Sequence, residues 1–240
     1  RSDQWMVGYY ERVMKCAARH RLFVDMHGSY TPKGLYRTYP NLLTYEGVLG
    51  MEQGGRCKPE NSNWLPFIRN AVGPMDFTPG SMFSAQPEDN RSTGANPMGT
   101  GTRAYQMALY VVFESPLQML ADNPVLYRRE HPCTEFLAAV PTTWDSLRVL
   151  RAACGREVVV ARRKGDKWYV GGITNDRPYT TEIALDFLPA GRTFTMTSFE
   201  DGVNADLQAT DYRKRVREVD ASTVVKVEMV RNGGWAAVIE

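Results

Sequence analysis

The stretch DQWMVGYYERVMKCAARHRLFVDMHG, residues 3–28, predicts how the first part of the chain folds. Apolar residues recur at helical spacing between residues 4 and 19, which indicates an amphipathic helix. The run from Leu22 to Met26 indicates a short buried strand that ends at His27 and Gly28. A helix followed by such a strand is typical of the α/β alternation of a parallel sheet.

The next hundred or so residues continue this alternation less regularly. Ser29 to Asn63 is rich in Gly, Pro, Tyr and charge, and it predicts a long loop of the kind that often carries function. The remaining expectations are a helix over Trp64–Ala71, a strand end at Met75 and Asp76, a loop over Gln86–Thr102, a helix over Arg103–Phe113, a last core strand over Leu117–Leu120, and helical pieces over Asn123–Val140 interrupted by Pro132.

The pattern changes near Thr142, where short β-type runs begin. They are separated by turn signals such as Lys164-Gly165-Asp166 and predict an antiparallel β-sandwich. We therefore expect an α/β domain over residues 1–141 and an all-β domain over residues 142–240. The predicted strands are Leu147–Ala153, Val158–Arg163, Trp168–Thr174, Thr180–Asp186, Phe194–Ser198, Val224–Met229 and Ala236–Ile239.

Composition excludes several classes of function. The chain has 240 residues and a formal net charge of +2, so nucleic acid and acidic membranes are poor candidates for partners. No apolar run approaches the roughly 20 residues that span a bilayer. The four cysteines form no CxxC pair, which argues against a zinc or redox motif and favours buried free thiols. The chain begins Arg1-Ser2-Asp3-Gln4 without an initiator Met, so we expect a fragment of a longer protein.

Five ionisable residues lie at predicted strand ends or on the long loop, where α/β barrels place their active sites. They are Asp25, His27, Glu46, Glu52 and Asp76. Carboxylates with one nearby His fit glycoside hydrolysis, which needs a proton donor to the leaving oxygen and a second carboxylate opposite it. From the pattern alone, His27 is as well explained by a structural role as by substrate binding. Asp25 could orient its imidazole or bond to the backbone of the following turn.

Glu46 and Glu52 are separated by an even number of positions, which in an extended segment places both on one face. Two converging carboxylates repel each other unless a cation or a proton intervenes, and calcium prefers several oxygen ligands of this kind. The alternative interpretation is two solvated surface glutamates.

Two stretches resemble glycoside hydrolase family 97, a family of α-glucoside and α-galactoside hydrolases. They are VDMHGSYTPKGLYRTYPNLLTYEGVLGMEQ (Val24 to Gln53) and LPFIRNAVGPMDFTPGSM (Leu65 to Met82). The opening DQWMVGYYERV (Asp3 to Val13) is also similar to the helix after the family's fourth barrel strand. The resemblance implies that residues 1–141 form the C-terminal half of a (β/α)8 barrel and residues 142–240 a C-terminal β-sandwich.

Residue by residue, the resemblance implies that Glu52 is the catalytic acid and also a calcium ligand. It implies that Glu46 is a second Ca2+ ligand and that His27 contacts substrate. Inverting members carry a Glu directly after this His, whereas this chain has Gly28 and resembles the retaining branch. The nucleophile of that branch is an Asp that would lie upstream of Arg1.

The resemblance therefore implies an exo-acting hydrolase of terminal α-linked sugars, with α-galactosides favoured over α-glucosides and an oligosaccharide or α-glycoside as its partner. It also implies a periplasmic or secreted location. Residues 1–240 alone are expected to be inactive and poorly soluble, because they would lack the nucleophile and expose unpaired sheet edges. The alternative from another class is a non-catalytic carbohydrate-binding protein on the same scaffold.

Overall fold

A small N-terminal lobe is built from the helix and strand that open the chain. The computed structural model describes residues 2–240, and helix α1 spans Gln4–Arg19, as predicted. Asp3 caps it, since its carboxylate accepts a hydrogen bond from Met6 N at 2.9 Å. Strand β1 (Val24–Met26) pairs in parallel with β2 (Leu42–Tyr45). The predicted strand is thus confirmed over its last residues only.

The segment predicted as one long loop contains regular structure. Helix α2 (Leu35–Thr38) and β2 come first, followed by the 3-10 helix η1 (Met51–Arg56) and helix α3 (Pro59–Ser62). The prediction of an irregular loop over Ser29–Asn63 was therefore wrong. Its elements are only four to six residues long, which is too short for hydrophobic periodicity to reveal them.

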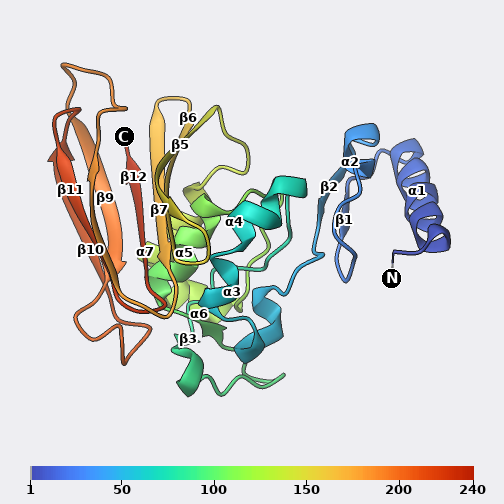
Figure 1. Ribbon diagram of the computed structural model, residues 1–240, viewed down its shortest axis with the longest axis horizontal. Coiled ribbons are helices and arrows are strands. Elements are labelled where there is room, and N and C mark those ends of the chain that lie inside the picture. Colours follow the sequence, from blue (N-terminus) through green and yellow to red (C-terminus); the bar gives the residue numbers. More distant parts are fainter. Residues whose placement is uncertain (1) are drawn as a thin grey trace.

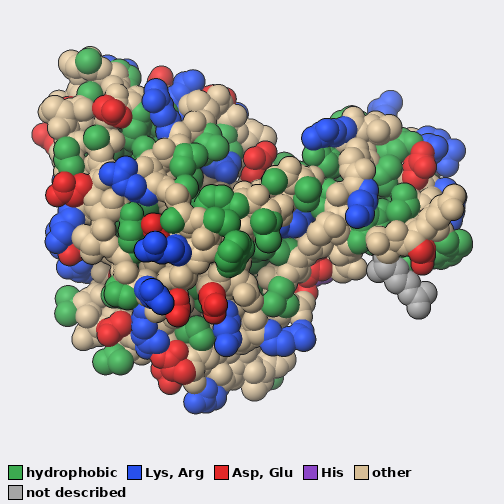
Figure 2. All heavy atoms as spheres, viewed as in Figure 1, with side chains coloured by type: hydrophobic (Ala, Val, Ile, Leu, Met, Phe, Trp, Pro, Cys, Tyr) green, Lys and Arg blue, Asp and Glu red, His purple; other side chains and the backbone are tan. Residues whose placement is uncertain are grey.

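The lobe joins the rest of the molecule by continuing its parallel pairing. Tyr45 forms a parallel bridge with Met75, and Met75 N donates to Glu114 O at 3.1 Å. Successive backbone N–H groups of a strand point to opposite sides. Glu114 therefore lies on one side of Met75 and β2 lies on the other. In the space-filling view this connection is a narrower waist between the lobe and the main body (Figure 2).

Helices and short strands lead from this waist to the C-terminal sheet. They are α4 (Leu65–Ile68), the 3-10 helix η2 (Asn70–Val72), β3 (Ser84–Ala85), the 3-10 helix η3 (Pro87–Asp89), β4 (Gly99–Thr100), α5 (Arg103–Val112), α6 (Pro124–Arg129) and α7 (His131–Ala139). The predicted helix over residues 103–113 is confirmed. Pro132 does not interrupt a helix but lies in the first turn of α7, where its missing N–H costs nothing.

The predicted strand over Leu117–Leu120 is wrong. The structure assigns no strand there, and the side chains of Met119 and Leu120 are exposed. Pro116, which directly precedes this run, has no N–H to donate to a sheet. The pairing beyond Met75 is made by Glu114 instead.

The C-terminal part is an antiparallel sheet with the strand order β10-β9-β12-β7-β6-β5 (Figure 1). Its strands are β5 (Ser146–Ala153), β6 (Glu157–Lys164), β7 (Lys167–Thr174), β9 (Phe194–Asp201), β10 (Tyr212–Val219) and β12 (Gly234–Ile239). A second layer pairs β8 (Tyr179–Ala184) with β11 (Val224–Met229). All seven predicted strands are present, and β10 was missed.

Both faces of the large sheet are covered, since α5 packs against β7 and β12 on the side away from β8 and β11. A Cβ atom at Gly171 of β7 would come within 2.9 Å of Ala108 O on α5. This explains why β6, β7 and β12 are buried in continuous runs rather than in alternation. The predicted sandwich is therefore a sheet between two thin layers. The hydrophobic core on one face of this sheet contains residues from both sides of position 141, so the domain boundary there stays a prediction.

All four cysteines are free, so no disulfide framework is present. Cys57 and Cys133 are buried, as expected, but Cys16 and Cys154 are exposed. Among residues 2–240, no helix combines the length and the apolar character that a membrane crossing needs.

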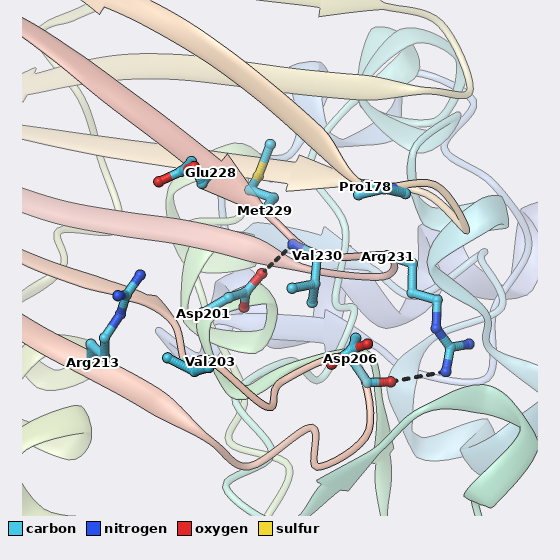
Figure 3. A pocket seen from close by; sticks show the side chains of 10 residues that line it. Pro178, Asp201, Val203, Asp206, Arg213, Glu228, Met229, Val230 and Arg231 are labelled. Atoms are coloured by element: carbon cyan, nitrogen blue, oxygen red, sulfur yellow. Dashed lines mark hydrogen bonds between the residues drawn. The ribbon is translucent and has the colours of Figure 1, made fainter.

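A cavity of about 450 Å3 opens at the end of the C-terminal sheet (Figure 3). Its basic side chains already have acidic partners, because Arg231 pairs with Glu88 and Arg213 lies 3.8 Å from Glu200. Asp201 lies beneath it and accepts hydrogen bonds from Thr102 Oγ1, Val230 N and Gly234 N. We infer that these hydrogen bonds attach α5 to the sheet and do not mark a ligand-binding site.

Candidate functional site

The five ionisable residues singled out from the sequence come together around the imidazole of His27. Its Nε2 atom lies 3.0 Å from Glu52 Oε1 and 3.8 Å from Glu46 Oε1. On the other side of the ring, Nδ1 lies 2.8 Å from Asp76 Oδ2. Asp25 belongs to the same group, with a carboxylate oxygen within 4.8 Å of the ligand atoms of His27 and Asp76.

The parallel strands explain this convergence. His27 directly follows β1, Glu46 directly follows β2, and Asp76 follows the bridging residue Met75. The carboxyl ends of parallel strands meet at one edge, so the side chains after them become neighbours. The sequence placed His27 and Asp76 at strand ends and Glu46 on the long loop, and the structure brings all three to one edge because Glu46 follows a strand that was not predicted.

Glu52 reaches the site in another way. The even spacing from Glu46 assumed an extended segment, but Gly47 has a φ of +45° and η1 begins at Met51. The chain turns back after Glu46 instead of running straight, so the argument from spacing was wrong although both carboxylates do approach His27.

The two glutamates differ in their surroundings. Only 10% of the Glu46 side chain is exposed, and its Oε2 accepts a hydrogen bond of 2.6 Å from Gly28 N. Glu52 is 43% exposed, and its Oε1 accepts a hydrogen bond from Gln53 Nε2 at 3.0 Å. Glu46 is therefore held by the backbone, whereas Glu52 remains accessible from solvent.

Asp76 is the residue that orients His27. Its side chain is fully buried, and its hydrogen bond raises the pKa of His27 to about 9, with Glu52 and Glu46 adding to this effect and burial opposing it. Asp25, which the sequence suggested for this role, makes no hydrogen bond to the ring. Burial, with Asp76 close by, raises the pKa of Asp25 to about 7.

Two residues that support the site were not found from the sequence. The buried guanidinium of Arg69 donates to backbone carbonyls at the end of β2, and Thr78 Oγ1 accepts a hydrogen bond from Glu52 N at 3.0 Å. Arg69 follows the apolar pair Phe67-Ile68, and the sequence predicts that it lies on the exposed face of a helix. The hydrophobic periodicity therefore did not indicate that its side chain is buried. Glu52 and Thr78 also line a cavity of about 200 Å3.

The donor set can hold a cation. Ligand atoms of His27, Glu46 and Glu52 all lie within 4.8 Å of one another. Carboxylate oxygens are the ligands that Ca2+ prefers, and Glu46 still has one oxygen free of its backbone hydrogen bond. Two carboxylates provide fewer oxygens than the six to eight that Ca2+ usually takes, so water, substrate or other residues would have to complete the shell.

Comparison with known sequences adds independent findings. Residues 143–240 match the family model described as "Glycosyl-hydrolase 97 C-terminal, oligomerisation", and residues 1–48 match that of "Glycoside hydrolase 97". Together the matched ranges span more than half of the chain.

Relatives agree with this assignment. The chain is 42% identical to a protein of Bacteroides thetaiotaomicron named retaining alpha-galactosidase, over 100% of this chain and 37% of the relative. It is 33% identical to a probable retaining alpha-galactosidase of Streptomyces bingchenggensis, over 96% of this chain and 33% of the relative. The chain thus spans about a third of the length of these relatives.

Solved structures give the same result. The fold is similar to that of a glycoside hydrolase family 97 enzyme from Pseudoalteromonas sp. strain K8, solved in complex with panose. The TM-score is 0.88 at 36% sequence identity, and the match covers 99% of this chain and 37% of that one.

Proposed function

Because the chain belongs to glycoside hydrolase family 97, we propose that it is the C-terminal part of an exo-acting retaining α-glycosidase that favours α-galactosides. Two relatives are named as retaining or probable retaining alpha-galactosidases, and a solved relative was captured with an oligosaccharide. These names support retention and an oligosaccharide or α-glycoside substrate.

The proposal includes the architecture of the first 141 residues. We propose that they are the C-terminal half of a (β/α)8 barrel, supported by the parallel succession of β1, β2 and Met75 and by the pairing of Met75 with Glu114. The candidate site lies at the carboxyl ends of these segments, as active sites do in such barrels.

In this mechanism Glu52 acts as general acid and then as general base. Its exposed carboxyl protonates the glycosidic oxygen as the bond to the sugar breaks, and later removes a proton from the attacking water. The nucleophile is a carboxylate outside residues 1–240. Retaining enzymes hold the two carboxyl groups about 5–5.5 Å apart. The 40% exposure of the His27 side chain supports the proposal that it contacts the substrate.

The approach of Glu46 and Glu52 to one nitrogen of His27 is the observation that carries the proposal. Two carboxylates that approach one nitrogen also repel each other, so holding them together costs free energy that the fold has to offset. Their convergence at a strand-end edge favours a catalytic site over two solvated side chains. A protein that only binds sugars has no need of an accessible carboxyl held in this way.

The stereochemistry can be tested on the full-length protein with 4-nitrophenyl α-galactoside, followed by proton NMR from the first turnovers. Retention predicts that α-galactose appears first and that the β-anomer grows in only by mutarotation. The same assay with the α-glucoside is expected to give a lower kcat/KM. Initial release of the β-anomer would contradict retention, and a higher kcat/KM on the glucoside would contradict the substrate preference.

We also propose that Glu46 and Glu52 hold Ca2+. A bound Ca2+ would supply positive charge to the two carboxylates and to substrate oxygens beside them. Both carboxylates also approach Nε2 of the His27 ring, at 3.8 Å for Glu46 and 3.0 Å for Glu52.

Glu46→Gln is therefore expected to weaken Ca2+ binding by tenfold or more, because it removes half of the carboxylate charge of the pair. Calorimetric titration of Ca2+ into the EDTA-stripped full-length protein measures this directly. Glu60→Gln, an exposed glutamate in α3, is the matched control and should bind Ca2+ as the parent does. Equal Ca2+ affinity in the parent and in Glu46→Gln would remove Glu46 from the ligand set.

A further inference from the structure

Thr78 has an unusual backbone conformation beside the candidate acid. Its φ is +55°, in the left-handed region that β-branched residues rarely adopt. The following residue is Pro79, which further restricts the backbone of the residue before it. Strained residues of this kind persist where the surrounding structure requires them and are concentrated at functional sites.

The Thr78 hydroxyl makes two hydrogen bonds that fix the start of η1. It donates to Phe77 O at 2.7 Å and accepts from Glu52 N at 3.0 Å. Phe77 O also accepts from Met51 N at 2.8 Å. The backbone of Met51 and Glu52 is thus attached to the segment Phe77–Thr78.

The same segment also restrains the side-chain carboxyl of Glu52, through Asp76 and His27. Asp76 binds His27 Nδ1 at 2.8 Å, and His27 Nε2 lies 3.0 Å from Glu52 Oε1. Residues 76–78 therefore restrain both the backbone and the carboxyl of Glu52. Since the Glu52 side chain is 43% exposed, packing alone provides little of this restraint.

From these contacts we infer that Thr78 is a positioning residue for the proton donor Glu52. Glycine would adopt this φ without strain, but it has no hydroxyl to accept the Glu52 N–H. Thr78 and Glu52 also line the same cavity of about 200 Å3, so a changed backbone at Thr78 would shift Glu52 in the wall of that cavity. This inference rests on the proposed role of Glu52 as general acid.

The test compares Thr78→Gly with Thr78→Ser in the full-length enzyme, using methyl α-galactoside and 4-nitrophenyl α-galactoside. The methyl leaving group needs a proton, whereas nitrophenolate leaves with little help. Thr78→Gly should lower kcat/KM on the methyl glycoside by about tenfold, the value of one hydrogen bond, and on the aryl glycoside much less. Thr78→Ser keeps the hydroxyl and should remain within about twofold on both substrates.

Thr78→Gly is expected to fold with a thermal midpoint near that of the parent, because relief of the strained φ offsets the lost hydrogen bonds and the greater freedom of glycine in the unfolded chain. Thr134→Val, which removes a helix hydroxyl bonded to Tyr127 O, is a control that should leave the ratio of the two substrates unchanged. Equal losses on both glycosides, or no loss, in Thr78→Gly would overturn the inference. A Thr78→Ser variant as impaired as Thr78→Gly would also overturn it.

Glu52→Gln measured alongside separates the two proposals. If Glu52→Gln shows the dependence on the leaving group and Thr78→Gly does not, only the role of Thr78 fails. If Glu52→Gln shows no such dependence, the proposed acid itself is wrong.

Discussion

Glu52→Gln in the full-length enzyme is expected to lower kcat/KM on methyl α-galactoside by about 10²- to 10⁴-fold, the usual contribution of general acid catalysis. Glutamine has nearly the same shape and can still accept the hydrogen bond from the His27 ring through its amide oxygen. What it lacks is a proton to give to the leaving oxygen. The loss should therefore be much smaller on 4-nitrophenyl α-galactoside, whose leaving group needs little protonation.

A second readout follows from the base role of the same carboxyl. In a retaining mechanism Glu52→Gln also slows the attack of water on the glycosyl enzyme, and a small anionic nucleophile such as azide needs no general base. Added azide should therefore raise kcat of Glu52→Gln on the aryl glycoside and yield a glycosyl azide. Glu60→Gln should respond like the parent. Turnover of the methyl glycoside at the parental rate would exclude Glu52 as the acid.

The elements that could be predicted from the sequence are those whose side chains carry a periodic signal. Helix α1 was predicted over its full length, because Tyr10, Val13 and Met14 face the small core of the lobe at helical spacing. Strand β11 was predicted to the residue, since its exposed and buried positions alternate strictly. In both cases local sequence and tertiary packing require the same conformation.

Strand β10 was missed because it is an edge strand with a charged face. Arg213, Arg215 and Arg217 alternate along it, and all three pair with Glu200, whose side chain is only 9% exposed, on the neighbouring strand β9. Charged side chains on an edge discourage pairing with other chains, but they remove the apolar alternation by which a strand is recognised. Ion pairing with another strand cannot be seen in a local pattern.

The candidate site shows the same limit. Predicted strand ends identified Asp25, His27 and Asp76 as candidates, and the long loop identified Glu46; the structure makes them neighbours because parallel strands bring their carboxyl ends together. The partners were not predictable, since the bond between Asp76 and His27 joins residues 49 positions apart. Thr78 was not predictable either, because its role depends on a backbone conformation that its residue type disfavours.

Arg69→Met in the full-length protein should lower the free energy of unfolding by about 3–5 kcal/mol, because it leaves several buried carbonyls without donors. The guanidinium, only 4% exposed, donates to Tyr45 O, Glu46 O, Gly47 O, Gly73 O and Pro74 O at 2.9–3.2 Å. Burial without a carboxylate partner lowers the pKa of Arg69 to about 10, which shows that the charge is costly to bury and that the hydrogen bonds offset this cost.

The position of Arg69 makes its loss a test of how the site is assembled. The carbonyls that it binds belong to the end of β2 and to the approach to Met75, the two segments that cross the waist and place Glu46 and Asp76. Arg69→Met should therefore lower the thermal midpoint by roughly 10 °C and also weaken Ca2+ binding at temperatures where the protein is still folded. Arg148→Met, an exposed arginine on β5, should change neither quantity. Loss of stability with unchanged Ca2+ affinity would mean that Arg69 supports the fold but does not position Glu46.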